Sequence, residues 1–429
     1  MGTPTSQLHE ALRATLAQRG VASAQQLAAA LRISQPTLSR ALAALADEIL
    51  VLGAGRSTRY AWPHRVLGLA ATQALHWVHE DGRIERLGQL HFINGQRVHV
   101  AAPGIEDLSD AALPWLLSPL RGEGFIGRTQ AQALVAFGLD RDPGRWPLEH
   151  QLFAALHVGD APGAIVLGEH TSPPLPALQA EVDLDRLADA AVGGAHAGAS
   201  AGGEQPKFLA RHADGQPVLV KFSPHRGTPF GVRWNDLLHA EALALVVLGE
   251  HGVPAARGEV VNTARRTYLV SPRFDRVGLA GRRHAVPLHA VHAAFVHGPQ
   301  QHWAASTEAL VAQRRLPADA AAQVHAIRHF GRLIGNTDMH FGNLSLLVAR
   351  DDAARGRFSL APVYDMLPMR WRPDHASGDL GLLPFTPEAI DLQSAARPVA
   401  AEFWRRAAAQ RLVSAEWRQL ARQMLARLS

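Results

Sequence analysis

A polar interruption between two apolar segments constrains this chain more than any other feature of its sequence. Residues 335–347 read GNTDMHFGNLSLL and lie between the helical pattern HAIRHFGRLIG and the strand-like run NLSLLVA. Within six positions the chain places Asp338, His340 and Asn343. Buried polar groups are costly unless they find partners, so the pattern predicts a short loop whose side chains face a cleft.

The spacing of these side chains favours phosphoryl transfer. Asp338 and Asn343 are separated by four residues, the interval in the kinase catalytic loop H-R-D-x-x-x-x-N. Phosphoryl transfer needs a carboxylate that orients the acceptor hydroxyl and oxygen ligands that hold magnesium. Asp365, in APVYDMLP, follows a short strand at the place of a further magnesium ligand. We predict Asp338 as the base, Asn343 and Asp365 as metal ligands, and His340 as a brace of the catalytic loop; a structural turn is the alternative for Asp338 taken alone.

Lysine is almost absent from the chain. Lys and Arg together number 43, and only Lys207 and Lys221 are lysines. An ammonium is a compact point charge that a planar guanidinium cannot replace where space is tight, so both positions are candidates for phosphate contacts. Gly202 and Gly203 precede Lys207 and would let backbone amides approach an anion closely. A flexible linker explains the same glycines equally well.

Two further segments match a kinase small lobe and its hinge. Lys221 lies on the strand-like run PVLVKF, and Glu241, twenty residues later on a predicted long helix, is a candidate ion-pair partner. A surface role for Glu241 is the alternative. In YLVSPRFDR a strand pattern breaks, and the backbone between Val270 and Arg273 is predicted to meet an adenine edge. We interpret Asp275 as a structural partner of an arginine.

The N-terminal segment predicts a winged helix-turn-helix that binds DNA. Three helical patterns and two short strands around a Gly-Ala-Gly turn occur in this order. The stretch SQPTLSRAL would be the recognition helix; a helical dimerisation module is the alternative. The predicted DNA contacts are Gln35, Thr37, Ser39 and Arg40 in the major groove and Arg56 and Arg59 near phosphates.

Composition shifts divide the chain into three parts. Residues 1–62 form the DNA-binding domain, and Pro63 begins a linker. Residues 67–195 alternate strand and helix patterns without a cluster of reactive side chains, and a Gly/Ala-rich stretch precedes the kinase core at 196–429. The histidines of 284–302 have irregular spacing, which favours packing over a zinc site.

The overall composition excludes several classes of protein. The apolar content of 47% is that of a folded chain, and the absence of Cys excludes disulfides and thiolate metal sites. No apolar run reaches the roughly 18 residues of a membrane helix, and the N-terminus lacks a signal-peptide pattern. We therefore expect a cytoplasmic protein without membrane contact. The net charge of +5 is too modest to establish a nucleic-acid binder by itself.

Several separated motifs in the same order resemble one family. SAGGEQPK, VLVKF, the Arg-Phe-Asp-Arg run, IGNTDMHFGN and PVYDMLP are similar to motifs of the HipA-like serine/threonine kinases of bacterial toxin–antitoxin systems. Asp338, His340 and Asn343 match that family's D-x-H-x-x-N pattern. The resemblance covers roughly residues 85–429. The N-terminal helix-turn-helix departs from the usual pattern and resembles the branch with a fused DNA-binding domain.

This resemblance implies an α+β fold, two-lobed and protein-kinase-like, preceded by a winged helix-turn-helix. It implies a kinase that uses ATP and Mg²⁺ to phosphorylate a cellular protein, such as an aminoacyl-tRNA synthetase or another translation factor, and so inhibits growth. Ser200 matches a serine that members autophosphorylate, and the N-terminal domain would bind double-stranded DNA for autoregulation. A homodimer and a separate antitoxin are left open. The alternatives are a transcription regulator that senses a nucleotide and a small-molecule phosphotransferase.

Overall fold

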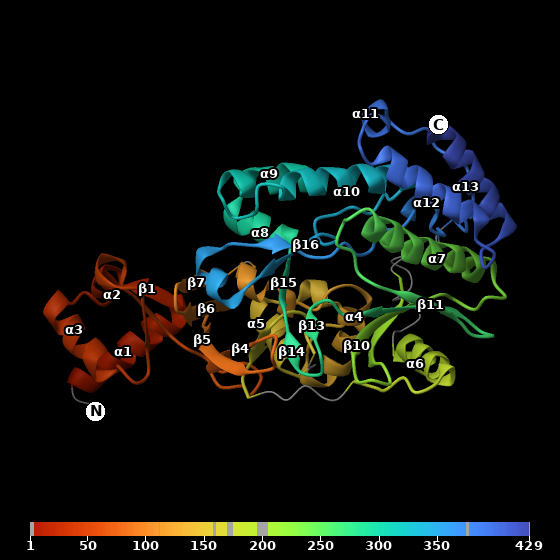
Figure 1. Cartoon of the computed structure of the whole chain (residues 1–429). Helices are drawn as coiled ribbons and strands as arrows, with labels where there is room; N and C mark the ends of the chain where they lie inside the picture. Colours follow the sequence, from red (N-terminus) through yellow and green to blue (C-terminus); the bar gives the residue numbers. More distant parts are fainter. Residues whose placement is uncertain are drawn as a thin grey trace.

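The computed structural model describes residues 4–110, 112–157, 160–169, 175–194, 205–374 and 377–428. Figure 1 shows a small N-terminal part at one end, a middle part built on a twisted sheet, and a larger C-terminal part with most of the long helices. Within the described ranges, no helix combines the length and apolar character needed to cross a bilayer.

The N-terminal part has three helices and a small antiparallel sheet of strand order β1-β3-β2. Ser23 caps the second helix through a capping box with Gln26, and Ser34 caps the third, which has Pro36 in its first turn. The predicted helices and the two strands around the turn are present; the first strand was not anticipated. The elements are α1 (Pro4–Arg19), β1 (Val21–Ser23), α2 (Ala24–Leu31), α3 (Gln35–Ala44), β2 (Leu50–Leu52) and β3 (Arg59–Ala61).

The N-terminal part is docked onto the middle sheet. The prediction that Pro63 begins a free linker is therefore corrected. Pro63 forms a β-bridge with Ile93, and Asn94 donates from Nδ2 to the carbonyl of Ala17 at 2.8 Å. Extended chain at this junction pairs with the end of β5 instead of running free. A small apolar cluster that includes Leu52, Ala61 and Ile93 is shared by the two parts.

The middle part is a five-stranded antiparallel sheet of order β7-β6-β5-β4-β8. One face is fully buried through side chains such as Phe92 and Val100, because alternate residues of a strand point to the same face. Two helices lie beside it. The elements are β4 (Thr72–Val78), β5 (Ile84–Ile93), β6 (Arg97–Ala102), β7 (Ile105–Ser109), α4 (Gly124–Leu134), α5 (Leu148–His157) and β8 (Ile165–Leu167).

The small lobe that follows is a four-stranded antiparallel sheet of order β11-β12-β10-β9 with a long helix against it. Helix α6 (Glu181–Gly194) also packs here, since Leu184 and Ala188 share a core with Phe208 and Tyr268; this lies before the predicted boundary at 196. The other elements are β9 (Lys207–Arg211), β10 (Pro217–Phe222), α7 (Pro229–Glu250), β11 (Glu259–Asn262) and β12 (Thr267–Pro272).

The large lobe is mainly helical, and its core contains the fully buried Trp303, Trp404 and Trp417. A small sheet of order β15-β16-β17 lies at its base. The predicted catalytic loop connects the end of α10 to the start of β16. The elements are β13 (Arg276–Val277), β14 (Gly281–Arg282), β15 (His284–Pro287), α8 (Leu288–Phe295), α9 (Trp303–Ala312), α10 (Ala320–Ile334), β16 (Ser345–Val348), β17 (Ser359–Leu360), α11 (Ala389–Leu392), α12 (Arg397–Ala409) and α13 (Ala415–Leu428).

Candidate active site

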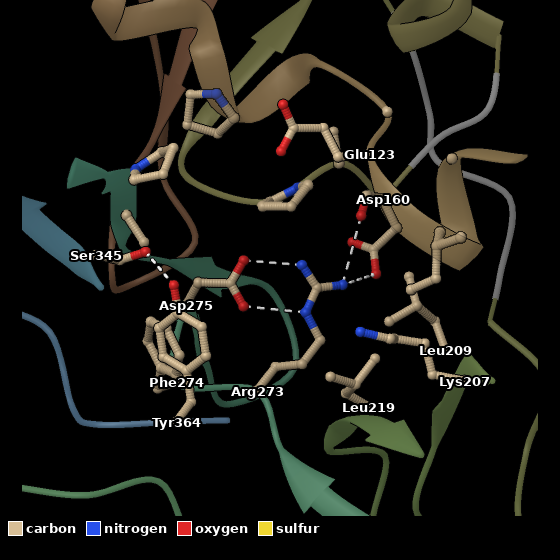
Figure 2. Close-up of a pocket in the computed structure, with 18 of the residues that line it drawn as sticks. Glu123, Asp160, Lys207, Leu209, Leu219, Arg273, Phe274, Asp275, Ser345 and Tyr364 are labelled. Carbon is tan, nitrogen blue, oxygen red and sulfur yellow. Dashed lines mark hydrogen bonds and ion pairs between the residues drawn. The ribbon is translucent and has the colours of Figure 1, made fainter. Parts of the chain in front are cut away.

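A cavity of about 370 Å³ lies where the middle part meets the two lobes. Figure 2 shows side chains from all three parts around it. Glu123 comes from the middle part, Lys207 and Leu219 from the small lobe, and Ser345 and Tyr364 from the large lobe. Small-molecule sites are concave and combine an apolar lining with a few placed polar groups. The cavity has this character.

The two lysines of the chain face each other across one pair of strands in this cavity. Lys207 on β9 is the direct register partner of Lys221 on β10, and both line the cavity. Like charges directly opposite each other destabilise a sheet. Within the described ranges the Lys207 ammonium forms no hydrogen bond or ion pair, so this positive charge is available to an anion in the cavity.

Lys221 is buried between two carboxylates. Its Nζ donates to Oε1 of Glu241 at 2.5 Å and forms a second ion pair with Asp365. Burial alone lowers the pKa of Lys221, but the two carboxylates outweigh it and raise the pKa above its usual value. The lysine therefore remains charged. The predicted Lys221–Glu241 pair is present.

The pKa values of the two carboxylates in this group shift in opposite directions. Burial raises the pKa of Asp365, but Lys221 and then Lys207 outweigh it, and the pKa falls to about 2. Burial dominates at Glu241, which is 2% exposed, and raises its pKa. Asp365 is thus the ionised oxygen donor that a cation in the cavity would meet.

Asp365 also has an unusual backbone. Its φ of 51° lies in the left-handed region, which is uncommon for a residue other than glycine, although Asp tolerates it better than most. Such conformations cost on the order of 1–3 kcal/mol and cluster at functional sites. The carboxylate of this residue contacts Lys221.

Asn336 joins the predicted catalytic loop to Asp365. Its Oδ1 accepts from the backbone amide of Asp338 at 2.9 Å, and its Nδ2 lies 3.4 Å from the carbonyl oxygen of Asp365. The Nδ2 of Asn343 donates to the carbonyl of Asp338 at 2.8 Å. These contacts bring Asp338, Asn343 and Asp365 together, and Lys221 contacts the last of them. Asn336 was not among the residues predicted from the sequence, although it lies two residues before Asp338.

Tyr364 is a second link that the sequence analysis missed. Its hydroxyl donates to the carbonyl of Gly342 at 2.8 Å and lies 2.7 Å from Oγ of Ser345. Burial raises the pKa of Tyr364, so the phenol stays protonated and keeps this hydrogen bond. Its ring stacks on Phe274, with the centroids 5.6 Å apart. The aromatic residue directly before Asp365 was the available signal.

His340 is exposed and bonded within the loop. Its Nδ1 accepts from the backbone amide of Gly342 at 3.0 Å, and its carbonyl accepts from Nε1 of Trp303 at 2.9 Å. These contacts agree with a bracing role. Asp338 and Asn343 are half-buried and lie outside the residues that line the cavity.

The predicted hinge residues differ in their surroundings. Val270 does not line the cavity, because its side chain lies on the opposite face of the sheet, in the core that includes Leu184 of α6, while its neighbour Ser271 lines the cavity. Arg273 lines the cavity, but its guanidinium is engaged by Asp160 at 2.5 Å and by Asp275 at 2.8 Å. Asp275 has the structural role expected of it. Figure 2 shows both ion pairs.

Three of the predicted site residues have no described position. Ser200, Gly202 and Gly203 lie outside the described residues.

Among the residues that are described, no group of three His, Asp or Glu side chains could by itself hold a metal ion. Asn343 and Asp365 still fit a magnesium ion that takes its remaining ligands from phosphates and water. In the histidine-rich segment, His292 is buried and bonded to Ser306.

The predicted DNA contacts lie on α3 and on the wing formed by β2 and β3, in the N-terminal part at one end of the molecule (Figure 1). Gln35, Ser39 and Arg40 on α3 are exposed, and Thr37 is half-buried with its hydroxyl 2.9 Å from that of Ser34. The wing residues Arg56 and Arg59 are exposed.

Comparison with known proteins places the chain in a family. A model described as the HipA-like C-terminal domain matches residues 199–429, and one described as the middle domain of YjjJ-like toxins matches residues 69–173. Toxin YjjJ of Escherichia coli (strain K12) is 35% identical over 434 residues, which cover 95% of this chain and 94% of that protein.

Solved structures resemble the fold at lower identity. HipA of Shewanella oneidensis MR-1, in a complex with HipB and operator DNA, aligns with a TM-score of 0.51 and 16% identity over 83% of this chain and 96% of that one. The Helicobacter pylori proinflammatory kinase CtkA aligns over 52% of this chain and 87% of that one, at 12% identity and a TM-score of 0.34, too low to carry an argument.

The fold and the buried Lys–Glu–Asp group define a two-lobed protein of the kinase-like class. The family match over the C-terminal half and the full-length relative make the assignment narrower: the chain belongs to the HipA-like toxins and resembles the YjjJ toxin in its middle part as well.

Proposed function

We propose that the chain is a serine/threonine protein kinase that uses ATP and Mg²⁺ and inhibits growth by phosphorylating a cellular protein. The observation that carries the proposal is the convergence of Lys207, Lys221 and Asp365 on one cavity, with the loop of Asp338 and Asn343 bonded to its edge. Two cations and an ionised carboxylate are the groups that a magnesium-bound triphosphate requires.

Each group has a distinct role in this proposal. Lys207 and Lys221 bind phosphate oxygens, while Glu241 holds Lys221 in place. Asp365 and Asn343 provide oxygen ligands for magnesium, which when bound neutralises charge on the phosphates. Asp338 orients the acceptor hydroxyl and accepts its proton.

The ion pair between Lys221 and Asp365 suits a site that exchanges partners. A triphosphate offers Lys221 new negative charge, and its metal offers Asp365 a new cation. Both members of the pair therefore keep a charge partner when nucleotide binds. This limits the cost of opening a buried ion pair, which is high when one charge is left alone.

The proposed regulation has two parts. Autophosphorylation of Ser200 would add about two negative charges beside the nucleotide phosphates and oppose their binding. The N-terminal part would bind double-stranded DNA through α3 and the wing, which agrees with the exposure of Arg40, Arg56 and Arg59. The relative from Shewanella oneidensis was solved with HipB and operator DNA; for this chain, DNA contact would come from its own N-terminal part, with or without a separate antitoxin.

The test is incubation with γ-labelled ATP and cell lysate, comparing wild type with Asp338→Ala. We expect a labelled protein band, with translation factors and aminoacyl-tRNA synthetases as the first acceptors to examine. The variant should lose transfer while it keeps its circular dichroism spectrum. Undiminished labelling would refute the role of Asp338. If the label is found only on small molecules, or if the nucleotide binds without transfer, the proposal of a protein kinase is refuted.

A further inference from the structure

A second cavity, of about 460 Å³, lies on the large lobe. Its walls are the turn after α9, the end of β16 and the segment before β17. Its lining includes the apolar side chains of Leu316, Leu347 and Phe358, of which Leu316 and Phe358 are buried and are taken here as its floor, and the cationic side chains of Arg314, Arg315 and Arg357. Asp352 is the acidic residue that lines it. The cavity therefore combines a positive charge with an apolar floor.

Two of these arginines have free guanidinium groups. Arg314 and Arg357 are exposed, and in the described ranges no hydrogen bond or ion pair engages either side chain. By contrast, Arg332 of the same lobe pairs with Asp391 at 2.8 Å. The two free charges at the second cavity are therefore open to an external anion.

Arg315 has a different role and fixes the wall. Its guanidinium lies 4.0 Å from the centre of the Phe295 ring and donates to the carbonyls of Arg355 and Gly356 at 3.0 Å. The backbone of Arg315 accepts from the amide of Phe358 at 2.7 Å. The turn that carries Arg314 is thus held rigidly against the segment that carries Arg357.

The backbone of Arg314 gives an independent reason to regard this position as special. Its φ is 58°, and its amide bonds to the carbonyl of Val311 at 2.8 Å. This left-handed position after a helix is usually glycine, because a Cβ is disfavoured there. The chain places an arginine with an unpaired side chain at a position where glycine would be more stable.

The cavity lies close to the proposed catalytic loop along one strand. Asn343 precedes β16 by two residues, Ser345 lines the first cavity and Leu347 lines the second. Residues two apart on a strand are about 7 Å apart and share a face. The two cavities therefore share strand β16 as part of their lining.

We infer that this second cavity is a docking site for an acidic segment of the protein acceptor, with an apolar side chain on the floor and carboxylates on Arg314 and Arg357. The inference rests on the proposed kinase function, since it names the kind of acceptor that reaches the first cavity. A concave site with an apolar floor suits a peptide side chain better than the DNA backbone, which proteins contact mainly through phosphates.

The test measures peptide binding directly and does not depend on catalysis. A short fluorescein-labelled peptide of alternating Glu and Leu is titrated with the full chain, and anisotropy is followed at two salt concentrations. We expect saturable binding that weakens with salt and is about tenfold weaker for Arg314→Glu/Arg357→Glu. The matched control, Arg411→Glu/Arg422→Glu, makes the same charge change at exposed positions on α13 and the turn before it and should bind as wild type does.

Three results would overturn the inference. The first is absence of peptide binding, and the second is equal weakening of peptide binding in both double variants. The third is that duplex DNA displaces the peptide and that the affinity of the chain for this DNA falls in Arg314→Glu/Arg357→Glu but not in the control. Label transfer from γ-labelled ATP to lysate proteins is measured in parallel with wild type. If transfer is absent while the peptide still binds with the expected dependence, the kinase proposal fails and the docking site stands.

Discussion

Among single residues, Lys207 and Lys221 show where a lysine ammonium serves and an arginine guanidinium does not. Lys221 lies buried between Glu241 and Asp365, while Lys207 faces the same cavity without an ion pair among the described residues. A compact ammonium can contact two carboxylates in a small space, but a planar guanidinium requires the geometry of its fork. This accounts for lysine at position 221 in a chain that otherwise uses arginine.

Replacing Lys221 by arginine tests this account. We expect Lys221→Arg to lower transfer of labelled phosphate by about 10²-fold, the usual cost of losing one placed charge-stabilising donor, with the fold retained. Transfer and thermal unfolding are measured together, and Arg422→Lys serves as the reverse exchange at an exposed position. Activity equal to wild type would show that any cation suffices at position 221.

At the scale of elements, one buried ionic cluster joins the middle part to the hinge of the kinase-like lobes. Asp160 from the middle part pairs with Arg273 and Arg276, and Asp275 pairs with the same two arginines. The amide of Gly163 also donates to Asp275 at 3.0 Å. The segment between β12 and β13 is therefore fixed against the middle part, and the cavity keeps a wall that a kinase core alone would lack.

Removing one charge from this cluster should be costly. Asp275→Asn leaves Arg273 and Arg276 with less negative charge in a buried setting, so we expect a loss of about 3–5 kcal/mol in the free energy of unfolding. Urea denaturation measures it. Glu80→Gln, at the exposed pair with Arg283, is the control and should cost about 0–1 kcal/mol. Equal effects of the two substitutions would contradict the role of the cluster.

Considering the whole molecule, one contact between its parts depends on a neutral histidine, His284. His284 is buried between the middle part and the large lobe. Its Nδ1 accepts from the amide of Ala164 at 3.1 Å, and its Nε2 donates to the carbonyl of Leu116 at 3.0 Å. Burial lowers the pKa of His284 to about 4, and burial likewise lowers the pKa values of His91 and His239 to about 4.

The stability should therefore fall on acidification. The unfolded chain binds a proton at each such histidine below about pH 6.5, while the folded chain does so only near pH 4. The stabilisation from each neutral histidine is complete above about pH 6.5 and is lost as the pH falls toward 4. At pH 5 the loss in the free energy of unfolding is about 2 kcal/mol for each histidine. Urea unfolding at pH 7.5 and pH 5 measures the sum, and an NMR titration of His284 gives the individual value. A midpoint near 6.5 for His284 would contradict the prediction.

Local spacing made much of the site predictable. The interval from Asp338 to Asn343, the Lys221–Glu241 pair and the structural role of Asp275 follow from chemistry that short motifs encode. Asn336 and Tyr364 were missed because an amide and a phenol are common in loops, and only their distant partners reveal their roles. Val270 was expected at the cavity, but its side chain lies on the opposite face of the sheet, in the core with α6, and that face is set by the register of distant strands.

The class of fold and the polar groups proposed for phosphoryl transfer could be recognised in the amino-acid sequence, because these depend on residue types and short intervals along the chain. The pairing of Lys207 with Lys221, the closure of the cavity by the middle part and the docking of the N-terminal part at Ile93 and Asn94 became visible only in the folded molecule. Those features are contacts between residues far apart in the chain. They arise from strand register and buried surface, which no local pattern records.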